Sequence, residues 1–282
     1  MTTIATPYRV STITCNGSIG KSVGEVYLDK LYEQLPIVPI DTEERGFIYL
    51  IDKQGKESKG VLPKKPTKTL RTNLTAEEQY KKRRFDNAIS GYFKIRPGYS
   101  PSVKIFKNGT IQMTGVKSIE DGKQLNEWVF QTVEKLDPSI IEKNNLQLGD
   151  FFVRLINSDF TTSYNIRRKE LHHILISPQY GNTSSFQPGT YPGVKLQYFW
   201  NPTNQNGVCH CTGKCFGKGQ LPGECKKITI SIFESGKILI TGAIQFSQID
   251  EAYAYICRIL EKHKPTLQKV PLNCGNGNGS SG

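Results

Sequence analysis

The stretch IFKNGTIQMTG at residues 105–115 recurs as IFESGKILITG at residues 232–242, with an offset of 127 residues. In each copy two runs of alternating apolar and polar residues flank a short segment that contains a glycine. This is the pattern of a β-hairpin, in which two antiparallel strands are joined by a tight turn. A repeat of this length predicts that the chain contains two copies of one structural unit.

A helical pattern follows each hairpin at the same offset. Residues that are mostly apolar recur at helical spacing, in the first copy at Leu125, Trp128, Val129, Thr132, Val133 and Leu136, and in the second at Ala252, Tyr255, Ile256, Ile259, Leu260 and His263. Residues at this spacing share one side of a helix. We therefore expect an amphipathic helix after each hairpin.

Each copy also has elements upstream of its hairpin. Strands are expected at 9–14 and 152–157, and a capping box at Ser22–Glu25 predicts a helix with Tyr27, Leu28, Leu31 and Leu35 on its apolar side. In the second copy, residues 166–175 take this part. Each copy then reads as strand, helix, several antiparallel strands, helix. The sequence predicts an α+β fold with about ten strands and four helices on one face of the sheet.

The changing offsets between the copies locate two insertions. The predicted first repeat is 7–140 with a basic insertion at about 47–80, the second is 150–266 with a cysteine-rich insertion at about 201–226, and 267–282 is a flexible tail rich in Gly, Asn and Ser. Both insertions are therefore expected to lie in connections between strands.

The charge is strongly positive. The chain has 37 Lys and Arg against 25 Asp and Glu, a formal net charge of +12, and residues 53–84 hold eleven of these basic residues against three Glu. This excess favours an anionic partner, with nucleic acid ahead of membrane. The basic stretch either contacts phosphates or is a solvated loop that aids solubility. A mean hydropathy of −0.43 excludes an integral membrane protein, and the first 20 residues lack the apolar run of a signal peptide, so we expect an intracellular protein.

The two sides of the predicted hairpins differ. Val103, Ile105, Ile111 and Met113 point to one side and form a core under the helices, as do Ile230, Ile232, Ile238 and Ile240. The opposite side carries Lys104, Phe106, Gln112 and Thr114 in the first copy, and Ser231, Phe233, Leu239 and Thr241 in the second. A face with exposed Phe and no helix over it is a binding surface, unless inserted loops cover it.

Four of the seven cysteines lie within one loop. Cys209, Cys211, Cys215 and Cys225 follow a C-x-C-x3-C-x9-C spacing. Tetrahedral Zn²⁺ held by these thiolates would fix a loop that has no core of its own, and His210 is an alternative ligand. Disulfides and free thiols are the other two interpretations. Cys15 and Cys257 lie on regular elements, where small core residues are expected.

The paired F-x-x-G-x-x-x-x-T-G hairpins, each followed by a helix, resemble the TATA-box-binding protein (TBP) family, in particular the TBP-like proteins of large DNA viruses. In the second copy Asp150-Phe151, the segment 164–167 and the segment 191–193 are similar to the D-F, F-P-I-R and F-P-G motifs of that family. The resemblance covers roughly residues 7–46, 81–136 and 150–264.

This resemblance implies a saddle of two pseudo-twofold repeats with the helices on its convex face and the minor groove of DNA on its concave face. The aromatic residues that would wedge between base steps are Phe85, Phe106, Tyr191 and Phe233. The other DNA-binding positions are Tyr8, Val10, Lys104, Gln112, Thr114, Leu155, Asn157, Leu239 and Thr241, of which Thr114 and Thr241 would meet base acceptors. Tyr8 and Leu155 stand where the family has a pair of Asn, and Asn157 lies two residues on, on the same face as Leu155.

The function implied is that of a transcription initiation factor that binds and bends AT-rich promoter DNA as a monomer. The resemblance implies that no cofactor is required. The partners would be a viral or host RNA polymerase and its initiation factors. The protein would act in the host nucleus or a cytoplasmic viral factory, or be packaged in the virion. The segment 187–190 lacks the acidic and Leu residues that recruit the B-type initiation factor in the family. An architectural or packaging protein with the same saddle is the alternative. We expect no enzyme, because the chain has no phosphate-binding loop, H-E-x-x-H or G-x-S-x-G motif and lacks the module that DNA glycosylases add to a related domain.

Overall fold

The computed structural model describes residues 4–20, 24–63, 87–203, 205–219 and 223–269. The chain divides into two compact units. We call Thr12–Leu155 the first unit, and the N-terminal segment up to Ser11 together with the chain from Ile156 onward the second unit. The predictions for Phe85, for Ser22, for most of the basic insertion and for the end of the C-terminal tail lie outside the described residues.

The first unit is an antiparallel sheet in the order β3-β2-β4-β5-β6-β1. Its elements are β1 (Arg9–Ser18, of which the residues from Thr12 on belong here), α1 (Leu28–Gln34), β2 (Gly46–Ile51), β3 (Ser58–Gly60), β4 (Ala88–Lys94), β5 (Ser102–Phe106), β6 (Thr110–Val116), α3 (Ile119–Glu134) and the 3-10 helix η1 (Pro138–Ile140). The predicted hairpin is β5–β6, with Ile105 opposite Ile111. β1 returns to pair with β6.

The second unit repeats this topology in the order β8-β9-β10-β11-β7. Its elements are β7 (Phe152–Thr161, from Ile156 on), α4 (Arg168–Ile176), β8 (Thr183–Ser185), β9 (Val194–Trp200), β10 (Lys226–Ile232), β11 (Lys237–Ala243), α5 (Phe246–Lys262) and α6 (Lys264–Leu267). The hairpin is β10–β11, and β7 pairs with β11 as β1 pairs with β6. The predicted repeat and the α+β fold class are confirmed, with eleven strands and five α-helices in the described part of the chain instead of ten and four.

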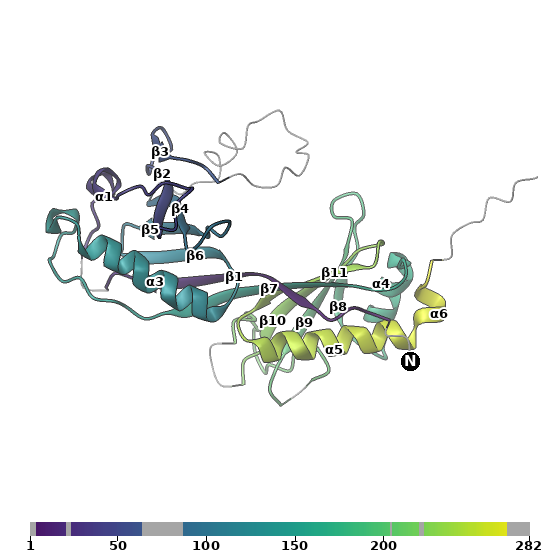
Figure 1. The fold of residues 1–282 in the computed structure, drawn as a ribbon. Helices are drawn as coiled ribbons and strands as arrows, with labels where there is room; N and C mark the ends of the chain where they lie inside the picture. The colour runs from purple at the N-terminus through teal and green to yellow at the C-terminus, as the bar shows by residue number, and fades with distance from the viewer. Residues whose placement is uncertain (1–3, 21–23, 64–86, 204, 220–222, 270–282) are drawn as a thin grey trace, which may run out of the picture. The chain divides into compact units, whose positions relative to one another are not determined.

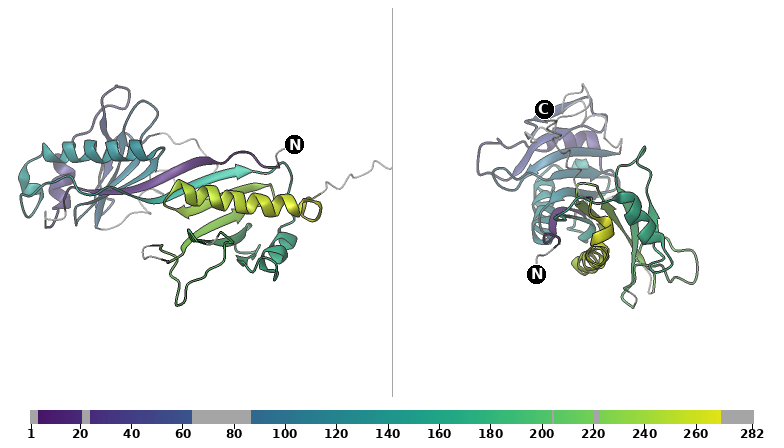
Figure 2. Two further views of the ribbon diagram at one scale, coloured as in Figure 1. Left: turned by 90° about the horizontal axis from the view of Figure 1, so that it is seen from below. Right: turned by 90° about the vertical axis from the view of Figure 1, so that its right-hand side faces the viewer.

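A long helix covers one face of the sheet in each unit. α3 packs on this face, with contacts to β6 and β2, and buries Leu125, Val129 and Val133 (Figure 1). α5 packs on the sheet of the second unit, with contacts to β11 and β9, and buries most of the residues predicted for its apolar side (Figure 2). Each fully buried Ile or Leu of such a face contributes about 1.5–3 kcal/mol relative to exposure, so these faces hold each unit together.

Three predicted boundaries are wrong. α1 begins only at Leu28, because Val26 pairs with Ile141 as an isolated bridge, and among the described residues no side chain caps the helix. The predicted basic insertion contains β2, whose six residues are all buried, and the short strand β3. The C-terminal tail begins later than residue 267, because the Leu267 side chain is fully buried and the Lys269 amide donates to the Asn165 carbonyl.

Within the described ranges, each helix is too short or too polar to cross a bilayer.

Candidate nucleic-acid interface

Burial alternates along the hairpin strands as the sequence predicts. Val103 and Ile105 of β5 are buried, whereas Lys104 and Phe106 between and after them are half-buried. β6 alternates in the same way, and its buried Met113 pairs with Cys15, which lies beneath α3 at Gly122. We call the side without the long helix the open face of each unit.

The open face of the second unit is polar, basic and aromatic. Lys195, Gln197 and Phe199 of β9 pair with Ser231, Thr229 and Lys227 of β10, and Ser231 and Thr229 pair onward with Leu239 and Thr241 of β11. The row of hydroxyl and amide groups lies between lysines. This surface can donate hydrogen bonds and neutralise phosphates, and it offers aromatic area at one end.

Tyr191 and Phe233 form an aromatic pair at the other end of the β9–β10 ladder, beyond the Val194–Ile232 pair and away from Phe199. Their ring centroids are 5.8 Å apart with the planes tilted by 54°. The Lys195 ammonium lies 4.0 Å from the centroid of the Tyr191 ring, a distance at which the cation is attracted to the ring face. Gly193 leaves space for both rings, because a Cβ there would lie 2.9 Å from Cε1 of Tyr191 and 3.2 Å from Cε1 of Phe233.

Arg168 of α4 holds the backbone around this pair. One guanidinium nitrogen donates to the carbonyl of Pro192, and the other lies 2.7 Å from Oε2 of Glu234. Pro192 follows Tyr191 and Glu234 follows Phe233, so one side chain links the two segments that carry the rings. Lys269 also donates to Glu234, at 2.6 Å, and its hydrogen bond and charge, with those of Arg168, hold the pKa of Glu234 below its ordinary value.

The first unit has the equivalent hairpin residues. Phe106 is half-buried opposite Ala88, Lys104 pairs with Gln112, and Thr114 is exposed. Partial burial lowers the pKa of Lys104 from its ordinary value. The predicted partner of Phe106 in a second wedge, Phe85, lies outside the described residues.

A second apolar layer covers the outer strands of this open face. Val38, Ile48, Tyr49, Ile51 and Tyr92 form a buried cluster, with Ile40 and Leu62 packed against it. Tyr92 pairs with Ser102, which pairs with Thr114, so the cluster lies on the side away from α3. The alternative in which loops cover the face therefore holds for β2 and β4 of the first unit.

Buried Lys94 anchors this layer. Its side chain is on the same side of β4 as Tyr92, and its ammonium donates to the carbonyls of Pro39 and Thr42, the latter at 2.7 Å. Lys94 is only 2% exposed. The loop after α1 is therefore bonded to the sheet that it covers.

Tyr8 does not lie on the open face. Its hydroxyl donates to Asp250 of α5 at 2.6 Å, and its ring packs edge-on against Tyr253, which also contacts core residue Phe160. Burial and the Asp250 contact raise the pKa of Tyr8 to about 12. The structure contradicts the predicted position of Tyr8, because the side chain is directed to the helix side.

Asn157 of β7 is a polar residue on the open face. Leu155 and Asn157 flank buried Ile156 in the sequence, so both point to the side opposite Ile156. Oδ1 of Asn157 accepts no hydrogen bond within the described part of the chain. Val10 is half-buried. Arg9 bonds Asp159 at 3.0 Å, and although burial opposes the charged carboxylate, Arg9 and Lys237 outweigh it, so that the pKa of Asp159 is below its ordinary value.

Sequence reasoning missed Asn16 of the first unit. It pairs with Gln112, so it faces the open side, and its Oδ1 also accepts no hydrogen bond from the described residues. The alternation with Cys15 on the core side was the signal that could have identified it.

The four loop cysteines lie together. Their sulfur atoms are all within 4.8 Å of one another, Sγ of Cys211 and Cys225 are 3.5 Å apart, and none of the four is in a disulfide. Four ligands at a Zn–S distance of about 2.3 Å would form a tetrahedron with edges of about 3.8 Å. His210 is directed elsewhere, since its Nε2 lies 3.0 Å from the Asn206 amide. The cluster can therefore hold a metal ion through sulfur alone.

Burial also acts on the thiol groups. It raises the pKa of Cys215 and that of Cys225 from their ordinary values. A bound cation would favour the thiolates that burial disfavours.

Comparison with known proteins confirms the resemblance that the sequence indicates. The family "Transcription factor TFIID (or TATA-binding protein, TBP)" matches residues 170–263, which lie in the second unit. A TATA-box-binding protein-like protein of Acanthamoeba polyphaga mimivirus is 29% identical over 180 residues, which are 61% of this chain and 46% of the mimivirus protein. The chain thus spans less than half of that relative.

More distant relatives are archaeal. The TATA-box-binding protein of Picrophilus torridus is 23% identical over 177 residues, covering 61% of this chain and 71% of that protein. A solved structure of Methanococcus jannaschii TBP aligns with 91% of this chain and 99% of its own, at a TM-score of 0.49 and 11% identity.

Proposed function

We propose that this chain, which resembles TATA-box-binding proteins, is a transcription initiation factor that binds the minor groove of AT-rich promoter DNA through its open faces and bends it. The observation that carries the proposal is the aromatic pair of Tyr191 and Phe233, held on the open face by Gly193 and Arg168.

The aromatic pair suits a wedge between base steps. Both rings are half-buried, so part of their apolar area faces solvent, which is unfavourable unless a ligand covers it. Insertion between stacked bases covers that area. Unstacking costs a few kcal/mol per step and is offset by the larger surface that a bent duplex contacts.

The hydroxyl and amide groups on the open face of each unit suit minor-groove acceptors. Thr241 and Thr114 occupy equivalent hairpin positions, and Gln112 and Gln197 flank them on the open faces. A·T and T·A pairs present only acceptors in the minor groove, whereas G·C pairs add the guanine amino group as a donor. Donors from this row therefore favour A·T pairs and distinguish little beyond that.

The partners in this proposal are double-stranded DNA, bound by a monomer, and a viral or host RNA polymerase with its initiation factors. The site of action would be the host nucleus, a viral factory or the virion. Residues 187–190 are exposed and uncharged, so we do not expect the usual contact with a B-type initiation factor. We propose no enzymatic activity.

An architectural role without promoter specificity is the second candidate. It is favoured by the absence of the family's Asn pair, since Leu155 is apolar and Tyr8 is bonded to Asp250 on the helix side. With fewer side-chain amides to contact the bases, a larger share of the DNA affinity would come from phosphate contacts and from the deformability of the duplex.

A bending measurement separates these candidates. A duplex labelled at both ends with a fluorescent donor and acceptor reports the bend as increased energy transfer when protein binds. A promoter factor should bind and bend a duplex with a central A·T run more strongly than one with a central G·C run. Equal binding and bending of promoter and random AT-rich duplexes would favour the architectural role, and no bend on any duplex would reject the proposal.

We also propose that Cys209, Cys211, Cys215 and Cys225 hold a structural Zn²⁺. Four sulfur donors are the ligand set of closed structural zinc sites, and the loop between β9 and β10 has few buried apolar residues of its own. When bound, the ion would cross-link the loop, and the Asn201 amide, which donates to the Gly223 carbonyl at 3.1 Å, would help to orient it.

A further inference from the structure

The cysteine loop presents an exposed aromatic residue between two cations. Phe216 is 62% exposed, more than any other large hydrophobic residue in the described part of the chain. The ammonium groups of Lys214 and Lys218 lie 5.3 and 6.0 Å from the centroid of its ring. We call residues 214–218 the finger.

The finger is fixed on both sides of Phe216. Cys215 belongs to the sulfur cluster, and the carbonyl of Gly217 accepts from the Lys227 amide at 2.9 Å. Lys218 pairs with Lys226 as an antiparallel bridge. Gly217 has φ +65° and approaches Lys227 so closely that a Cβ there would lie 2.4 Å from the Cβ of Lys227. The exposure of Phe216 is therefore a feature of a bonded loop.

The finger borders the open face of the second unit. Lys227 pairs with Phe199 on that face, at the end of β10 away from Phe233. Phe233 is six positions after Lys227, which corresponds to about 20 Å along a strand. The minor groove is only about 6 Å wide. If Phe233 enters the minor groove of a duplex, the finger is too far away to enter the same groove. It would instead contact the sugar–phosphate backbone of that duplex.

We infer that the finger is a second DNA contact, in which Lys214 and Lys218 bind phosphates and Phe216 packs on the deoxyribose between them. The inference rests on the proposed function. Segment 214–227 holds four Lys against one Glu, which is complementary to a polyanion. A protein partner is disfavoured, because the core of protein–protein interfaces is depleted of Lys.

The test measures binding of an AT-rich duplex over a range of salt concentrations. The variant Lys214→Ala/Lys218→Ala should lower the slope of log affinity against log salt by about two, since each phosphate contact contributes about 0.9. Phe216→Ala should weaken binding several-fold and leave the slope unchanged. Neither variant alters a cysteine, and unchanged metal content and melting temperature would confirm that the loop remains intact.

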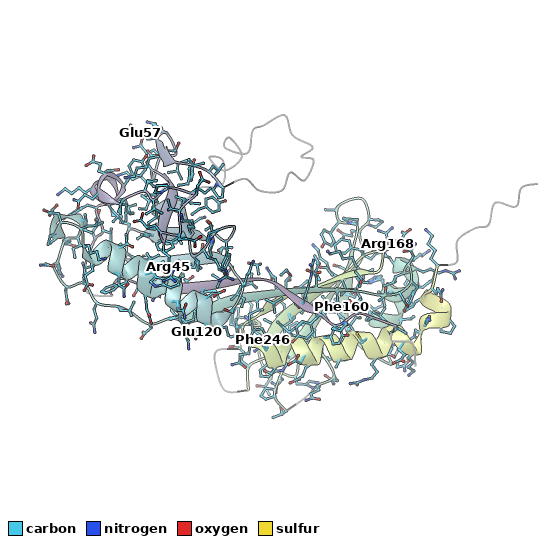
Figure 3. The ribbon with its side chains drawn as sticks, viewed as in Figure 1. Arg45, Glu57, Glu120, Phe160, Arg168 and Phe246 are labelled. Atoms are coloured by element: carbon cyan, nitrogen blue, oxygen red, sulfur yellow. The ribbon has the colours of Figure 1, made fainter. Side chains whose placement is uncertain are left out.

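Matched controls lie on the helix side. Lys123→Ala/Lys135→Ala removes the same charge from exposed positions on α3 and at its C-cap and should leave the slope as in the wild type. Phe246→Ala removes a 39% exposed ring at the start of α5 and should leave affinity unchanged (Figure 3).

Two negative results are distinguishable. If the wild type binds and bends the duplex but the lysine variant keeps the wild-type slope, or Phe216→Ala keeps the wild-type affinity, the finger is not a DNA contact and the proposed function stands. If the wild type binds no duplex, the proposed function fails and the inference with it.

Discussion

The Tyr191 ring packs on the Phe233 ring, with centroids 5.8 Å apart, although the residues belong to different segments. The register of the sheet brings them together. Val194 pairs with Ile232 as the last pair of the β9–β10 ladder, so the residues just outside that pair meet at its end. The geometry of the proposed wedge is therefore set by strand pairing and not by a loop alone.

Removal of one wedge ring should separate binding from folding. Phe106→Ala and Phe233→Ala each remove a half-buried ring from an open face, so we expect a loss of about 1 kcal/mol or less in unfolding free energy. DNA affinity and energy transfer on end-labelled duplex should both fall in each variant.

Phe160→Ala is the contrasting variant. Phe160 is buried against Tyr253 on the core side, and its truncation should cost about 3–5 kcal/mol of stability (Figure 3). If Phe106→Ala or Phe233→Ala instead unfolds the protein and the folded fraction bends DNA normally, these rings are core residues.

Gly193→Ala should displace the aromatic pair without removing an atom. The added Cβ would lie 2.9 Å from one ring and 3.2 Å from the other, so at least one ring must move. Overpacking of this kind costs about 1–3 kcal/mol of unfolding free energy. We expect the bend angle to fall even under conditions in which the variant remains folded. Gly189→Ala, where a Cβ meets no atom within 4 Å, is the control. Normal bending by Gly193→Ala would show that the position of the rings does not matter.

The ion pair between Arg168 and Glu234 makes the position of the aromatic pair dependent on pH. Because the pKa of Glu234 is lowered in the folded protein, its ion pairs stabilise the fold fully above the ordinary carboxyl pKa of about 4.3 and are lost as the pH falls through the lower folded value. Arg168→Gln and Glu234→Gln should each reduce bending at neutral pH (Figure 3). The wild type should keep its bend from neutral pH down to about pH 5. A bend that Arg168→Gln leaves intact would remove Arg168 from this role.

The hairpins and the long helices were predictable because their signals are local. Strand alternation places Ile105 and Phe106 on opposite sides, and helical spacing places Leu125 and Val129 on one side, whatever the rest of the chain does. The burial of these residues follows that pattern. The cysteine cluster was predictable for the same reason, since its four members lie within one loop.

The misplaced features depend on contacts between distant residues. Tyr8 faces α5 because its hydroxyl bonds Asp250 and its ring packs on Tyr253. The sequence pattern near residue 8 does not indicate these distant partners. The predicted insertion includes most of β2, because a strand that is buried on both faces lacks polar–apolar alternation and its sequence alone does not indicate that it pairs with β4. The layer over β2 and β4 likewise depends on Lys94 reaching the loop after α1.

Lys94→Met should destabilise the first unit. The substitution keeps an apolar chain of similar length but removes the buried ammonium that donates to the carbonyls of Pro39 and Thr42, and a hydrogen bond to a charged group contributes about 1.5–3 kcal/mol. Denaturant unfolding should show this loss, whereas Lys195→Met, at an exposed position, should unfold as the wild type does. Equal stability of the two variants would mean that the layer over β2 and β4 is held by its apolar cluster alone.

Metal removal should loosen the cysteine loop while the sheet stays folded. Protein purified under reducing conditions should contain about one zinc per chain, and Cys215→Ser should lose most of it, because a closed structural site needs all four ligands. The informative amide is that of Lys227, which donates to Gly217 in the loop. Its hydrogen exchange should accelerate on chelation, whereas the amide of Ile256, in the middle of α5, should exchange as before, because that buried helix does not depend on the loop. Hydrogen exchange at Lys227 that is the same with and without chelator, in protein that contains no metal as purified, would show that hydrogen bonds and glycine turns alone hold the loop and that the four thiols are free.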